Sequence, residues 1–205
     1  MTRRRHNRLA ALAAATAILL QACLLLPGAT WGLSFTTAPA LPSLPTVALN
    51  ARAQISNAQM NNFGVSDLLG GGWDVTVAGN TAVGTSPTFA QYCPNSGGCG
   101  ADAFGYVAAG KTLPAGSLTL NTTGASFTTV LGGPATFTCN STPCAIDSAT
   151  PSKLATESTG TLVASWTSTG FSATSLALST PTTLKTLPAS EIYRVDVVWT
   201  LNTGP

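Results

Sequence analysis

The strongest structural signal in the sequence is the segment 193–205, which reads YRVDVVWTLNTGP. Apolar side chains at positions 193, 195, 197, 199 and 201 alternate with mostly polar ones. A period of two, in a segment rich in β-branched and aromatic residues, predicts a half-buried β-strand, and the turn residues from Asn202 onward predict its end. Because chain ends fray unless they are tied into a sheet, we expect this strand to complete a sheet as one of its interior strands.

Other short segments with the same alternation recur along the chain. They are separated by Gly, Pro and Asn turns, and no segment after the first forty residues has a convincing helical period. This pattern predicts an all-β fold, an antiparallel β-sandwich that is immunoglobulin-like or related, preceded by a secretory signal helix. The expected strands cover 47–55, 63–69, 73–77, 118–120, 127–131, 135–139, 161–167 and 176–178.

The N-terminus has the pattern of a secretory signal. The positively charged MTRRRHNR is followed by an apolar run that ends at Pro27-Gly28. Small residues allow cleavage after Gly32 or after Ala40. The apolar run is close to membrane-spanning length, so a retained anchor is the alternative. A lipoprotein site at Cys23 is disfavoured because strongly apolar residues follow it.

These features divide the chain into two parts. We assign 1–40 to a signal peptide and a Pro-rich linker, and 41–205 to one β-sandwich domain. Only 8% of the residues are charged, against about 25% in typical soluble domains. Four of the nine basic residues lie in the leader, and the others are scattered, so the chain has no basic patch. We therefore expect no nucleic-acid partner and, after signal cleavage, no membrane contact.

Four cysteines follow the leader, at positions 93, 99, 139 and 144, and they allow three pairings. In an oxidising compartment we expect the disulfides Cys93–Cys99 and Cys139–Cys144, because each pair brackets a turn-forming loop. A zinc site is the alternative. The first pair is spaced too widely for the usual Cys-x₂₋₄-Cys ligand pattern and the second only reaches its limit, so we expect no metal.

Catalytic constellations are sparse. The only histidine, His6, is in the leader, so a Ser-His-Asp or Cys-His arrangement is excluded after cleavage. A glycosidase needs two facing carboxyl groups, and among the few acids Asp102, in a Gly-rich loop, is the least easily dismissed. No Gly-rich loop leads from a strand into a helix to hold a phosphate. We expect a non-catalytic protein without a cofactor.

Three tryptophans lie on the apolar faces of expected strands: Trp73, Trp166 and Trp199. Each of them either fills the core or forms an exposed platform for a sugar ring. The sequence leaves both alternatives open.

The terminal segment resembles a known motif. Trp199-Thr200-Leu201, near the end of a strand that opens with Tyr193, is similar to the distal motif of the WxL-domain surface proteins of Gram-positive bacteria. The segment Gly71-Gly72-Trp73 resembles the earlier motif of that family, although Val75 stands in place of its leucine.

The resemblance implies a secreted, cell-wall-associated protein that binds peptidoglycan or another cell-wall glycan non-covalently. It makes Trp73, Trp199, Leu201 and Tyr193 the candidate ligand-binding residues. The C-terminus carries no LPxTG-like sorting signal, which agrees with non-covalent attachment. The first alternative is an adhesin or structural subunit that assembles with other surface proteins by strand addition. A secreted glycoside hydrolase is the second.

Overall fold

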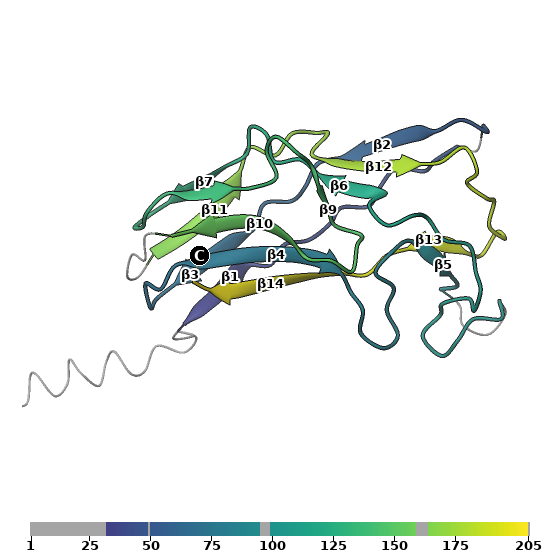
Figure 1. Cartoon of the computed structure of the whole chain (residues 1–205), viewed down its shortest axis with the longest axis horizontal. Helices are drawn as coiled ribbons and strands as arrows, with labels where there is room; N and C mark the ends of the chain where they lie inside the picture. The colour runs from purple at the N-terminus through teal and green to yellow at the C-terminus, as the bar shows by residue number, and fades with distance from the viewer. Residues whose placement is uncertain (1–31, 49, 95–98, 159–163, 205) are drawn as a thin grey trace, which may run out of the picture. The chain divides into compact units, whose positions relative to one another are not determined.

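The computed structural model describes residues 32–48, 50–94, 99–158 and 164–204, which belong to one compact unit (Figure 1). This unit is all-β, as the sequence predicts, and its strands pair antiparallel in a β-sandwich. The expected signal helix lies outside the described residues. Within the described ranges, no helix has the length and apolar character needed to cross a membrane.

Fourteen strands are present in the described part of the chain. They are β1 (Leu33–Thr37), β2 (Gln54–Ala58), β3 (Gly64–Asp67), β4 (Trp73–Gly79), β5 (Ala90–Tyr92), β6 (Leu118–Leu120), β7 (Ser126–Thr129), β8 (Ala135–Phe137), β9 (Cys144–Ala145), β10 (Ser152–Glu157), β11 (Ala164–Thr169), β12 (Leu176–Thr180), β13 (Ile192–Arg194) and β14 (Val197–Thr203).

The first layer of the sandwich consists of two sheets placed end to end. Their strand orders are β1-β3-β11-β7 and β2-β12-β6-β9. Three pairs of consecutive strands, β2 and β3, β6 and β7, and β11 and β12, each continue from one sheet into the other. The pairs Thr180↔Gln54 and Ala164↔Asp67 mark the two ends of one long, interrupted ladder.

Serine hydroxyls bridge the interruption. The Met60 amide donates to Ser175 Oγ at 2.8 Å, and the Phe63 amide donates to Ser168 Oγ at 2.7 Å. The Ser168 amide in turn donates to the Phe63 carbonyl at 2.8 Å. Buried backbone donors need partners, so these hydroxyls take over the role of the missing ladder bonds.

The second layer contains the sheet β14-β4-β10-β8 and the short pair β13-β5. The predicted terminal strand is divided between β13 and β14. β14 pairs only with β4, so the expectation of an interior strand was wrong: β14 is an edge strand. Alternation predicts only that one face of the strand is buried. Edge strands and interior strands both have such a face, so the pattern does not distinguish them.

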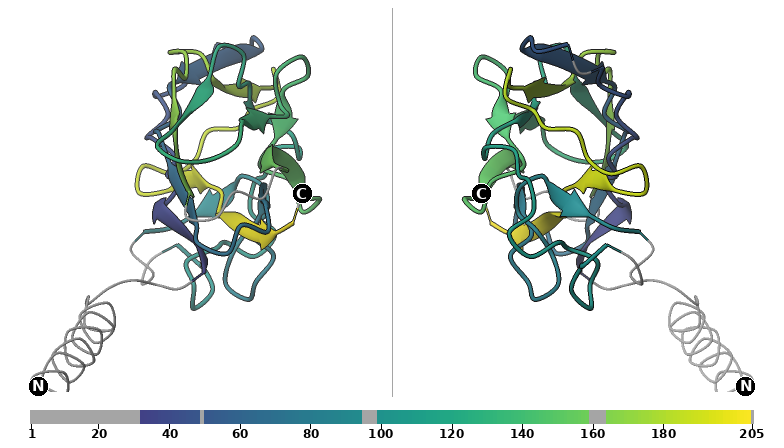
Figure 2. Two further views of the ribbon diagram at one scale, coloured as in Figure 1. Left: turned by 90° about the vertical axis from the view of Figure 1, so that its left-hand side faces the viewer. Right: turned by 90° about the vertical axis from the view of Figure 1, so that its right-hand side faces the viewer.

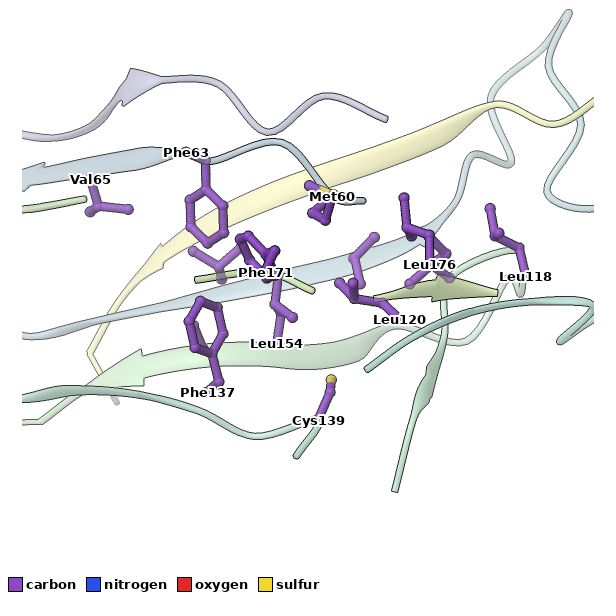
Figure 3. Packing of buried hydrophobic residues seen from close by; sticks show 14 of the residues in the cluster. Met60, Phe63, Val65, Leu118, Leu120, Phe137, Cys139, Leu154, Phe171 and Leu176 are labelled. Atoms are coloured by element: carbon purple, nitrogen blue, oxygen red, sulfur yellow. The ribbon is translucent and has the colours of Figure 1, made fainter. Parts of the chain in front are cut away.

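The core lies between the layers (Figure 3). Phe63 is fully buried, and its ring packs edge-to-face against Phe35, Phe127 and Phe137. Trp73 and Trp166 are also fully buried, with ring centroids 5.4 Å apart. The views in Figure 2 show strands arranged around this interior. Trp73 and Trp166 therefore fill the core.

Two disulfides join Cys93 to Cys99 and Cys139 to Cys144, which confirms the predicted pairing. Strand β1 lies inside the range 1–40, where a signal peptide and a linker are predicted, and it pairs with β3. The five residues of β1 lie between an apolar leader and a Pro-rich segment. Their alternating pattern is too short to be recognised as a strand between these two segments.

Candidate functional site

The predicted ligand-binding residues differ in their exposure. Trp73 is fully buried, so its ring offers no surface on which a sugar could stack. Tyr193, Trp199 and Leu201 are half-buried and pack against the margin of the core. In the β14–β4 ladder, Thr203 pairs with Trp73, so the two motif segments lie on neighbouring strands.

Tyr193 lines a groove to which both layers contribute side chains. Two hollows, of about 520 and 500 Å³, adjoin there and share the lining residues Leu44, Phe89, Ile192 and Tyr193. We call this depression the Tyr193 groove. Leu118 and Leu176, from β6 and β12 of the first layer, also line it. The groove therefore has an apolar floor contributed by both layers.

The Pro-rich segment 41–47 forms one side of the groove. Pro42 and Pro45 have no amide to donate to a ladder, and the segment contains no strand. Leu41 and Leu44 nevertheless pack against the core. The prolines thus keep the segment 41–47 out of the sheets, while Leu41 and Leu44 hold the segment against the core.

Polar groups surround the apolar floor. Arg194, Lys185 and Glu191 line the hollows. The Tyr193 hydroxyl donates to the Lys185 carbonyl at 3.1 Å. Burial raises the pKa of Tyr193 above its usual value, so the phenol remains protonated at neutral pH.

Arg194 is held by its neighbours. Its Nε and Nη2 donate to Asp196 Oδ1 at 3.0 and 2.7 Å, and its guanidinium lies 4.5 Å from the Tyr92 ring centroid. Asp196 Oδ2 accepts from the Ser86 amide at 3.1 Å and from the Tyr106 hydroxyl. Burial alone would raise the pKa of Asp196, but the hydrogen bonds from Tyr106 and Arg194 outweigh it and keep the pKa below its usual value. Asp196 therefore stays ionised and fixes Arg194 beside the groove.

Asp102, the candidate acid in the Gly-rich loop, is hydrogen-bonded within that loop. Asp102 Oδ1 accepts from the amides of Phe104 and Tyr106, both at 2.9 Å, and so shapes its own loop. Asp74 lies 3.6 Å from Lys153 Nζ and accepts from Asn202 Nδ2 at 2.8 Å. In the described part of the chain, no group of three or more His, Cys, Asp or Glu side chains is placed to hold a metal ion.

β14 presents a backbone edge without a ladder partner, although β1 lies close to it. The Gly204 amide donates to the Gly72 carbonyl, so the even-numbered residues of the ladder bond to β4. By alternation, the amides and carbonyls of Val197, Trp199, Leu201 and Thr203 point away from β4. This edge can accept another strand, and the Tyr193 groove can hold a ligand.

No family model, curated protein or solved structure matches the chain. The groove itself could not be found from the sequence, because Phe89, Leu118 and Leu176 are distant in the chain and converge only through the fold. The leucines between prolines at 41–45 were the one local signal, since apolar residues in a linker need a surface to cover them.

Proposed function

We propose that this protein is a secreted, non-catalytic surface protein that binds the bacterial cell wall non-covalently, with peptidoglycan or another cell-wall glycan lying in the Tyr193 groove. The observation that carries the proposal is the groove itself. Each hollow, of about 520 or 500 Å³, falls within the range of roughly 300–1,000 Å³ typical of ligand sites.

The chemistry of the groove suits such a ligand. Sugar rings and the alanine methyl groups of peptidoglycan stems offer apolar faces to Ile192 and the Tyr193 ring. Their carboxylates, hydroxyls and amines find charged partners in Lys185, Arg194 and Glu191 at the rim. Trp73 then acts from the core: it supports β4, the strand to which β14 is paired.

Retention on purified peptidoglycan sacculi tests the proposal. The matched pair of variants is Ile192→Ala and Ile55→Ala. Both isoleucines are exposed, by 49% and 67%, on short strands, but only Ile192 lines the groove. We expect the wild type to be retained above an albumin control, Ile192→Ala to lose a large part of that retention, and Ile55→Ala to keep it. Wild-type retention no greater than that of albumin would end the proposal.

A second candidate function is an adhesin or structural subunit that assembles by strand addition. The observation in its favour is the free edge of β14, because an unpaired strand edge is a template for another strand. The two candidates use different surfaces and are not exclusive.

A further inference from the structure

The edge of β14 lacks the features that normally protect exposed strands. Natural edge strands carry charges or prolines, are bulged, or are very short. β14 has seven residues, VVWTLNT, with no charge and no proline, and its ladder with β4 has no register shift. Other edges in the described structure are shorter: β8 has three residues, and the β1 ladder is bulged between Phe35 and Thr37.

The side chains of β14 are also incompletely covered. Trp199 and Leu201 point toward the core yet remain half-buried, and Val198 on the opposite face is 40% exposed. β1 lies close to β14 but does not pair with it, and an additional strand in the plane of the sheet would cover more of all three side chains. The composition of β14 therefore fits a strand that has a neighbour on each side.

We propose that this neighbour is β14 of a second copy of the chain, paired antiparallel about a two-fold axis at Thr200. The outward backbone groups belong to odd-numbered residues. Placing Thr200 opposite the partner's Thr200 sets odd residues against odd residues, so that Trp199 and the partner's Leu201 exchange hydrogen bonds. Among the registers that set odd residues against odd residues, this is the one in which the two copies of β14 overlap fully.

The side-chain pairs made by this register are favourable. Trp199 lies beside the partner's Leu201 on the core-facing side, and Thr200 lies beside the partner's Thr200 on the outer side. Aromatic–aliphatic and Thr–Thr pairs stabilise antiparallel sheets, whereas like charges directly opposite destabilise them. Because β14 is uncharged, self-pairing brings no like charges together. The two sheets that end in β14 would become one continuous sheet across the axis.

One strand pair buries little surface, so the dimer is weak and depends on concentration. The inference rests on the second candidate function, strand addition, and names its partner; binding to the wall through the groove does not depend on it.

Sedimentation equilibrium across a concentration series tests the proposal, with Thr200→Lys and Thr136→Lys as the matched variants. Thr200 and Thr136 are exposed threonines on the two opposite edges of one sheet. We expect the wild type to dimerise. The Thr200→Lys variant should stay monomeric, because two lysines would face each other across the axis. Thr136→Lys should dimerise like the wild type.

Cross-linking gives an independent readout. In non-hydrogen-bonded pairs the Cα atoms lie about 4.5 Å apart, within reach of a disulfide. Thr200→Cys should therefore form a disulfide-linked dimer on oxidation, seen by intact mass, and Thr136→Cys should not. A folded wild type that stays monomeric, or equal cross-linking of the two cysteine variants, overturns the second copy as the occupant of the edge. Sacculus retention measured on Thr200→Lys reports separately on wall binding, which this variant should keep.

Discussion

Asp147 offers the sharpest test of the energetics of this fold. The residue follows β9 and is completely buried. Neither carboxylate oxygen has a hydrogen-bond partner among the described residues. Burial raises the pKa of Asp147 from 3.8 to about 6. The nearby amides of Gly116, Ser117 and Leu118 oppose that rise without reaching hydrogen-bonding geometry.

The size and sign of the effect follow from this pKa. Because the pKa is higher in the folded state, the folded protein binds the proton more tightly, so stability decreases as the pH rises from about 4 to about 6 and is constant above that range. At 1.36 kcal/mol for each tenfold change, the difference between 3.8 and about 6 corresponds to about 3 kcal/mol. Replacing the carboxylate with a neutral amide removes this cost.

We therefore expect Asp147→Asn to raise the free energy of unfolding at pH 7 by up to about 3 kcal/mol and to flatten its dependence on pH between 4 and 6. Urea unfolding at closely spaced pH values, with the disulfides intact, measures both. Asp102→Asn, which removes the charge of an exposed acid, is the control for the loss of one carboxylate. An Asp147→Asn variant with the stability and pH slope of the wild type would refute the reasoning.

Three further changes test the packing. Phe63→Ala empties the centre of the aromatic cluster and should cost about 3–5 kcal/mol in urea unfolding, so a loss below about 1 kcal/mol would contradict the described core. Ser168→Ala leaves the buried Phe63 amide without its side-chain acceptor and should cost about 1–3 kcal/mol; an unchanged midpoint would count against the hydroxyl bridge. In Gly79→Ala the new Cβ would lie 2.0 Å from the Pro87 carbonyl oxygen, whereas in Gly71→Ala it would meet nothing within 4 Å. Thermal unfolding should show a loss of about 1–3 kcal/mol for the first and almost none for the second, and equal melting temperatures would disprove this difference.

The sequence predicted the terminal segment well in one respect. All five alternating residues, from Tyr193 to Leu201, pack against the core, because side-chain direction in a strand is a local property. The disulfides were also predictable, since residues that bracket a short turn meet whatever the remaining fold is. The number of neighbours of β14 was not predictable, because it depends on strands distant in the chain.

β10 shows why other elements escaped prediction. Its register shifts between Lys153 and Ala155, and the consecutive residues Leu154 and Ala155 are both buried. A bulge of this kind breaks the period of two on which strand prediction relies. The buried Glu157 further disguises the segment as a polar loop. The Tyr193 groove escaped for a different reason: its lining comes from separate strands and loops, with no pattern in any one of them.

The pairing of β14 with β4 has a consequence for biosynthesis. Asn202 and Asp74, which are joined across this ladder, are 128 positions apart in the chain. The sheet cannot close until the ribosome has made nearly all of β14, and contacts between such distant segments form slowly. For a chain with the predicted leader this delay is useful, because a translocation pore admits an extended polypeptide.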